Sequence, residues 1–195
     1  FQKIDLLMLL FAAKSTISLN APWASTGQNQ GYKKNMYNQL NGFKDLASYL
    51  QGDDTLFLQL AVKNGAKVIF NDQIDSYVIS RTELNWKSLL LQRGRWAGDA
   101  NIMWKFNRLF YLTAISLFIM SASMIGLIFS TYYILIIILL LKGVLETFLY
   151  ILGVNRFHQP IKYVDFMIWF MIHPIYVVIM GIFSFMNFQW KGKSI

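Results

Sequence analysis

The sequence predicts a mixed α/β domain that is followed by an amphipathic helix at a membrane surface and by three transmembrane helices. The mean hydropathy of the 195 residues is +0.40, which is high for a soluble domain of this size. Apolar residues dominate after Leu109, whereas residues 1 to 105 combine polar, Gly-rich and Asn-rich stretches with short apolar runs. Two of these runs are rich in β-branched and aromatic residues, which is typical of strands.

The polar half, residues 1–81, begins with a helical pattern and then contains one short helix and two strand patterns. After Gly52, apolar residues recur at helical spacing up to Asn64-Gly65, which predicts a short amphipathic helix with a glycine stop. Residues 67–70 and 77–79 are predicted to be strands. Because so few strands cannot close a domain around one core, we interpret the chain as the C-terminal portion of a longer protein.

Three apolar segments, 109–130, 132–152 and 164–188, make up most of residues 107–195. Each has about 20 residues or more, which at about 1.5 Å rise per residue spans a hydrocarbon core of about 30 Å. They are predicted to be transmembrane helices. The helical pattern before them has a polar face, so we expect residues 82–106 to contain an interfacial helix.

Basic residues precede the first span and lie between the second and third, at Arg93, Arg95, Lys105, Arg108, Arg156 and Lys162. These segments should face the cytoplasm, and the polar half with them. The net charge of +8 indicates contact with anionic membrane lipids and not nucleic acid, because the basic residues concentrate beside apolar segments. The absence of cysteine excludes a disulfide, a thiolate metal site and a cysteine nucleophile. Two histidines argue against a His-rich metal site.

The first candidate site is the acidic pair Asp53-Asp54 at the predicted helix start. A carboxylate beside an acceptor hydroxyl can act as a general base, and neighbouring carboxylates can separate each other's pKa values. The alternative is a helix cap, which contributes about 0.5–2 kcal/mol. Taken alone, the pair fits the cap more readily than the catalytic role.

Two further candidates are the sequence Gln92-Arg93-Gly94-Arg95-Trp96 and the loop 26–33. Arginine can bind a diphosphate, glutamine can add an amide contact, and Trp96 offers a flat face for a sugar ring. The same residues could instead anchor the helix in lipid headgroups. The loop is rich in glycine and amides, including Gly27 and Asn29, and could hydrogen-bond sugar hydroxyls, although such loops are common.

In this order the motifs resemble those of processive family-2 glycosyltransferases, such as cellulose, hyaluronan and poly-N-acetylglucosamine synthases, especially the bacterial ones. The resemblance covers essentially the whole chain. It depends on Gly27-Gln28-Asn29-Gln30-Gly31-Tyr32-Lys33, Asn41-Gly42-Phe43, Gly52-Asp53-Asp54 and Gln92-Arg93-Gly94-Arg95-Trp96. Gly31, Lys33 and Asn41 differ from the residues usual in that family.

The resemblance implies a role for each candidate residue. Asp54 would be the general base that deprotonates the acceptor hydroxyl, and Asp53 would orient or cap. Gln92 and Arg95 would contact the donor diphosphate and the acceptor end, and Trp96 would stack on the acceptor sugar. The implied reaction is an inverting displacement at the anomeric carbon of a nucleotide sugar, with transfer to a growing polysaccharide or glycolipid.

The resemblance also implies the surroundings of the site. Residues 1–81 would be the C-terminal half of a cytosolic glycosyltransferase A-type domain at a bacterial inner membrane, and a separate subunit could secrete the product. Mg²⁺ or Mn²⁺ would be held by an Asp-x-Asp element in the missing N-terminal half, because these 195 residues contain no such element. No residue of this chain is therefore expected to be a metal ligand. We therefore expect these 195 residues alone to be inactive.

Two other interpretations stay open. One is a non-processive transferase that adds a single sugar to a lipid, as ceramide glucosyltransferases do with a related Arg-Trp motif. The other is a non-enzymatic membrane anchor or structural protein. Inside the second span, Lys142 and Glu146 are four residues apart and are expected to pair on one helix face, with a glycan-lining role as the alternative.

Overall fold

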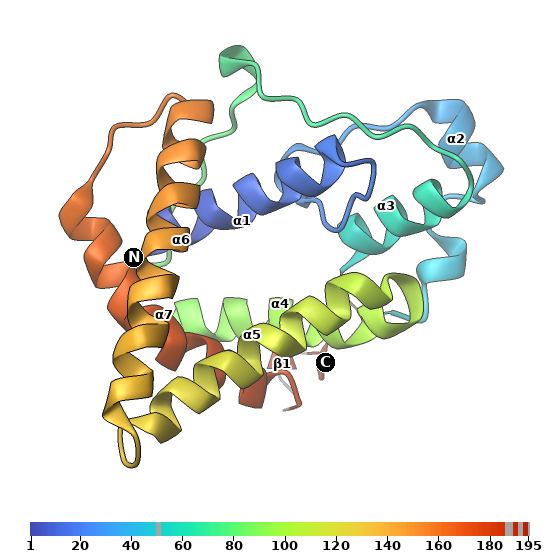
Figure 1. Cartoon of the computed structure of the whole chain (residues 1–195). Helices are drawn as coiled ribbons and strands as arrows, with labels where there is room; N and C mark the ends of the chain where they lie inside the picture. The colour runs from blue at the N-terminus through green and yellow to red at the C-terminus, as the bar shows by residue number, and fades with distance from the viewer. Residues whose placement is uncertain (50–51, 186–188, 191–192, 195) are drawn as a thin grey trace.

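The structure is a computed structural model that describes residues 1–49, 52–185, 189–190 and 193–194. Its elements are mostly helical (Figure 1). The α-helices are α1 (Gln2–Ser18), α2 (Lys34–Gln39), α3 (Asp53–Lys63), α4 (Trp86–Phe106), α5 (Arg108–Leu127), α6 (Tyr132–Arg156) and α7 (Tyr163–Phe183). Short 3₁₀ helices are η1 (Gly27–Asn29), η2 (Lys44–Leu46) and η3 (Ile74–Ser76), and β1 (Gln189–Trp190) pairs antiparallel with β2 (Lys193–Ser194).

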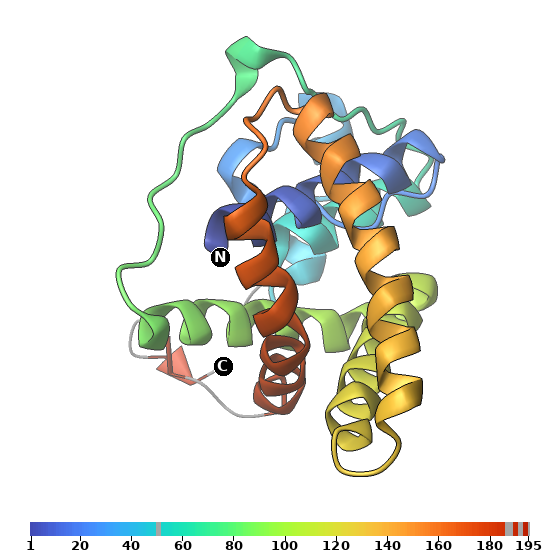
Figure 2. The same cartoon turned by 60° about the vertical axis from the view of Figure 1, so that its left-hand side comes forward.

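The two strands predicted at 67–70 and 77–79 are wrong. Both stretches belong to a long segment that joins α3 to α4 and contains η3 (Figure 2). A strand needs a neighbour for its backbone groups, and within the described residues β1 and β2 pair only with each other. Phe70 and Tyr77 instead pack against Phe157 just after α6, with ring centroids 5.9 and 6.5 Å away. The expected α/β architecture is therefore not present in the described part of this chain.

The three predicted spans correspond to α5, α6 and α7, which are long and apolar enough to cross a membrane. Helix α6 continues four residues beyond its predicted end, to Arg156. Helix α7 ends at Phe183, and the predicted positions 186–188 lie outside the described residues. Lys142 and Glu146 form the expected ion pair, so the charge of each is compensated within α6.

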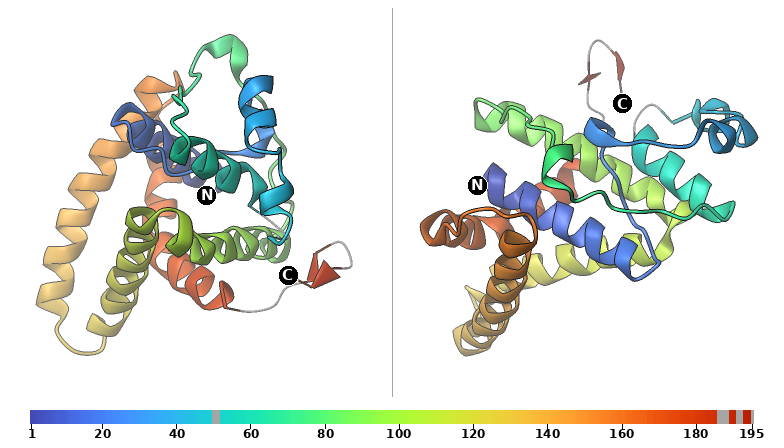
Figure 3. Two further views of the ribbon diagram at one scale, coloured as in Figure 1. Left: turned by 90° about the vertical axis from the view of Figure 1, so that its right-hand side faces the viewer. Right: turned by 90° about the horizontal axis from the view of Figure 1, so that it is seen from above.

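Helix α4 crosses α7 near the end of that helix (Figure 3). The side-chain amide of Asn101 donates to the Ser184 carbonyl at 3.1 Å. The orientation derived from the basic residues would place these two atoms on opposite membrane faces. The crossing is fixed by the start of α1, because the Phe1 ring lies between Trp86 of α4 and Tyr176 of α7, with centroids 5.5 and 5.1 Å away.

Two apolar cores hold the helices together. One joins α1, α6 and α7 and contains Ile4, Tyr150, Val154, Phe166, Trp169 and Phe170. The other joins α3, α4 and η2 and contains Leu40, Leu46, Leu56, Phe57, Ala61 and Met103. Because Leu56 and Phe57 follow one residue after the acidic pair, the second core fixes the position of the α3 N-terminus.

Candidate functional site

The acidic pair lies at the first turn of α3, as predicted. Gly52 precedes it with φ +75, a left-handed conformation that glycine adopts without steric cost. Asp53 is exposed and Asp54 is half-buried. Asp54 Oδ1 accepts from the Thr55 N–H at 2.7 Å, and Oδ2 accepts from the Gly27 N–H at 2.6 Å. Asp54 therefore caps backbone N–H groups and still has a free lone pair on each oxygen for another donor.

The glycine-rich loop packs directly on this turn. Gln30 donates from Nε2 to the Asp54 carbonyl at 3.0 Å, and the Ser25 hydroxyl donates to the same oxygen at 3.1 Å. Asn29 Nδ2 donates to the Ser76 carbonyl at 2.7 Å, away from the carboxylates. The structure thus brings Gly27 to Asp54, whereas Asn29 connects the loop to the segment that contains η3.

Helix α4 begins at Trp86, four residues after the predicted Thr82, because Asn85 caps it. Asn85 Oδ1 accepts from the Ser88 N–H at 2.9 Å. Gln92, a predicted ligand of the diphosphate, donates from Nε2 to Glu83 Oε1 at 2.9 Å. In this structure Gln92 therefore holds the start of its own helix.

Arg93 joins α4 to α1. Its Nη2 pairs with Asp5 Oδ2 at 2.9 Å, and both side chains are almost completely buried. Burial raises the pKa of Asp5, and the Arg93 charge opposes that rise. The guanidinium of Arg93 also lies 3.9 Å from the ring centroid of Trp96, which is half-buried. Arg93 thus covers part of the ring that is predicted to stack on a sugar.

Another side of α4, which carries Arg95 and Asp99, faces the acidic pair. Asp99 packs on Gly52, where an added Cβ would lie 3.1 Å from the Asp99 Cγ and Oδ1 atoms. Burial raises the pKa of Asp99 to about 7; the Arg95 charge opposes the rise, and the charges of Asp54 and Asp53 add to it. Four charged groups from two helices therefore interact at this turn.

Sequence reasoning missed Asp99, although its spacing gave a signal. It lies four residues after Arg95, which places both side chains on one face of α4. The structure thus links Arg95 electrostatically with the acidic pair through Asp99, while Gln92 and Arg93 contact Glu83 and Asp5 elsewhere.

The Asn41-Gly42-Phe43 turn supports α3 from below. Asn41 and Gly42 have φ values of +55 and +63, and a Cβ on Gly42 would lie 2.6 Å from the Tyr37 ring. This position therefore requires glycine. Phe43 packs on Phe57 of α3 with ring centroids 5.1 Å apart.

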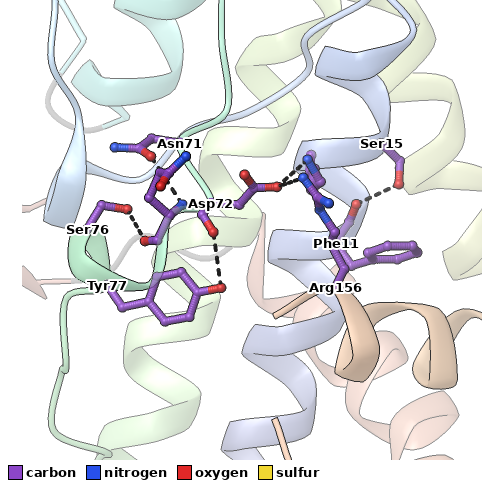
Figure 4. A network of polar contacts seen from close by, with 9 residues as sticks. Phe11, Ser15, Asn71, Asp72, Ser76, Tyr77 and Arg156 are labelled. Carbon is purple, nitrogen blue, oxygen red and sulfur yellow. Dashed lines mark hydrogen bonds and ion pairs between the residues drawn. The ribbon is translucent and has the colours of Figure 1, made fainter. Parts of the chain in front are cut away.

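An ion cluster ties the segment between α3 and α4 to the helices (Figure 4). Asp72 Oδ2 pairs with Lys14 Nζ of α1 at 2.6 Å and with Arg156 at the end of α6. The hydrogen bond from Lys14 lowers the pKa of Asp72, and that from Arg156 lowers it further. The cluster lies close in sequence to Ser76, whose carbonyl holds Asn29.

Within the described ranges, no three His, Cys, Asp or Glu side chains are placed to hold a metal ion. The carboxylates at the α3 turn are therefore not arranged as a metal-binding cluster.

A comparison with known protein families identifies the family of this chain. The family model described as glycosyl transferase family group 2 matches residues 5–183. The chain belongs to this family. The match extends from α1 to the end of α7 and includes the acidic pair, α4 and all three apolar helices. No match was found among curated proteins or among solved structures. As a family-2 glycosyltransferase domain, the chain works with a nucleotide-sugar donor and an acceptor.

Proposed function

We propose that this chain forms the acceptor side of an inverting, membrane-embedded glycosyltransferase. The observation that supports this most directly is the packing of Asp99 on Gly52, which joins the helix containing Gln92 to Trp96 to the turn that begins with Asp53 and Asp54. A membrane anchor has no need to bring these two motifs into contact.

In this proposal Asp54 is the general base. Its carboxylate accepts the proton of the acceptor hydroxyl while the acceptor oxygen forms a bond to the anomeric carbon. The bond from that carbon to the diphosphate oxygen breaks, and its electron pair leaves with the nucleoside diphosphate. The N–H groups of Gly27 and Thr55 hold the two Asp54 oxygens in place, and Asp53 orients the turn.

Residues of α4 would bind the other reacting groups. Arg95 compensates charge on the departing diphosphate, and Trp96 offers the ring face not covered by Arg93 to the acceptor sugar. Gln92 can reach the diphosphate only by exchanging its bond to Glu83. The divalent cation, Mg²⁺ or Mn²⁺, belongs in this proposal to ligands outside these 195 residues.

The acceptor is proposed to be a growing polysaccharide or a glycolipid at the cytoplasmic face of a bacterial inner membrane. The three apolar helices, of which α5 and α7 pack against α4, support an acceptor that is made at, or held by, a membrane. Product length separates a processive synthase from an enzyme that adds one sugar to a lipid. The anchor interpretation predicts no transfer at all.

The test is release of nucleoside diphosphate by the full-length protein in membranes, across a panel of nucleotide sugars. We expect release with one donor, and a loss of about 10²-fold or more in Asp54→Asn, because general base catalysis contributes that much. Asp45→Asn is the matched control, since Asp45 is an exposed carboxylate on η2. Unchanged release in Asp54→Asn, with normal membrane levels, would contradict the proposal.

A further inference from the structure

Asp99 is a half-buried residue to which the mechanism above gives no role. Its Oδ1 atom is enclosed and has no hydrogen-bond partner among the described residues. The carboxyl group lies directly over the Gly52 backbone, where only the missing side chain of glycine leaves room for it. Such a placement costs free energy, because a buried polar atom without a partner loses its hydration.

The charged groups around Asp99 come from both helices that meet there. Arg95 lies one turn earlier on α4, and Asp53 and Asp54 lie on the first turn of α3. Arg95 favours the ionised form of Asp99, whereas the two carboxylates disfavour it. Asp99 thus interacts electrostatically with both the proposed base and the proposed diphosphate-binding arginine.

We propose that Asp99 is a positioning residue of the transferase site: its ionised carboxylate holds the Arg95 guanidinium toward the reacting diphosphate, and its packing fixes the Gly52 turn that begins the acidic pair. This inference rests on the proposed function. It assigns Asp99 no contact with either substrate. Its effect is on the orientation of Arg95 and should appear in kcat more than in KM, because charge on the leaving diphosphate grows in the transition state.

The ionisation of Asp99 gives the inference a readout that packing alone would not change. Since its pKa is raised to about 7, the ionised fraction increases between pH 6 and 8. Diphosphate release by the parent should therefore decline below pH 7. Asp99→Asn keeps the shape of the side chain but cannot ionise. In this variant we expect kcat at pH 8 to fall about tenfold and KM to change little. The decline of diphosphate release below pH 7 should disappear.

A double-mutant comparison tests whether Asp99 acts through Arg95. Arg95→Gln should lower kcat on its own, and adding Asp99→Asn to it should have little further effect, because coupled residues are not additive. Asp75→Asn, an exposed carboxylate on η3, is the matched control. The amount of each variant in the membrane fraction and its thermal unfolding establish that it is folded.

The outcomes separate the two proposals. If Asp54→Asn abolishes release while Asp99→Asn keeps the kcat and pH profile of the parent, Asp99 has no positioning role and the transferase proposal stands. Additive effects of Arg95→Gln and Asp99→Asn also overturn the inference. If the parent releases diphosphate from no donor, or Asp54→Asn is unaffected, the proposed function fails and the role of Asp99 with it.

Discussion

Gly52 is the residue whose replacement reports most directly on the contact between α3 and α4. Its φ of +75 and the Asp99 carboxyl group, 3.1 Å from an added Cβ, both oppose alanine. Gly65 has a similar φ of +80 but open space around it. Both alanine variants should lose about 1–2 kcal/mol from the left-handed backbone, and only Gly52→Ala should also lose diphosphate release. Thermal unfolding in detergent and the release assay measure the two effects. Equal activity in both variants would show that the Asp99 contact does not matter for catalysis.

Asp99 also predicts how stability depends on pH. Because its pKa is raised from 3.8 to about 7, the folded protein keeps a proton that the unfolded chain loses. The contribution of Asp99 to the free energy of unfolding therefore declines as pH rises from about 4 to 7. Asp99→Asn removes this decline, so the variant should unfold at a higher temperature than the parent at pH 8 but not at pH 4. The same difference at both pH values would contradict a raised pKa.

Sequence reasoning located residues whose signal is local and missed those that depend on contacts between distant segments. The acidic pair follows a glycine and precedes an apolar helix, so its place at a helix start was confirmed. The partners of Gln92 and Arg93 include Asp5, almost ninety residues earlier in the chain. The burial of Asp99 depends on how α3 packs against α4. Neither contact can be derived from spacing within one segment.

At the scale of elements, helices with local start and stop signals were predicted well. The apolar spacing and the Asn64-Gly65 stop defined α3, which ends at Lys63. The strands at 67–70 and 77–79 failed for a physical reason: β-propensity reports how a side chain fits a half-buried surface. Here Phe70 and Tyr77 find that surface against Phe157, without a neighbouring strand.

The segment between α3 and α4 gives a prediction of its own. Asp72→Asn weakens the ion pairs with Lys14 and Arg156 that hold this segment on α1 and α6. A partly exposed ion pair contributes about 1 kcal/mol to stability. The population in which this segment is detached from α1 and α6 should therefore increase about fivefold. Trypsin should then cleave after the exposed Arg81 about fivefold faster than in the parent. Asp75→Asn, in the same segment, should not change the rate. Equal cleavage rates for Asp72→Asn and the parent would show that the aromatic contacts alone hold the segment.

For the whole molecule, the basic residues and the contacts of α7 favour different arrangements in the membrane. The distribution of basic residues predicts that the start of α5, the end of α6 and the start of α7 lie on the cytoplasmic side, and that the end of α7 lies outside. The structure brings that end to α4, through Asn101 and the Ser184 carbonyl. The length and apolar composition of α7 favour a full crossing. The contact with α4 favours an end that stays on the side of α4.

Single cysteines can decide this arrangement, because the chain contains none of its own. In sealed, right-side-out vesicles a membrane-impermeant thiol reagent should label Ser130→Cys, in the turn between α5 and α6. It should label Gln159→Cys and Ser48→Cys only after permeabilisation. We expect Phe185→Cys, just after α7, to be labelled from outside with Ser130→Cys, because the 21 residues of α7 form a helix that is long and apolar enough to span the hydrocarbon core. Labelling of Phe185→Cys only together with Ser48→Cys would show instead that α7 re-enters beside α4, and that the interfacial helix and the end of the third apolar helix share one membrane face.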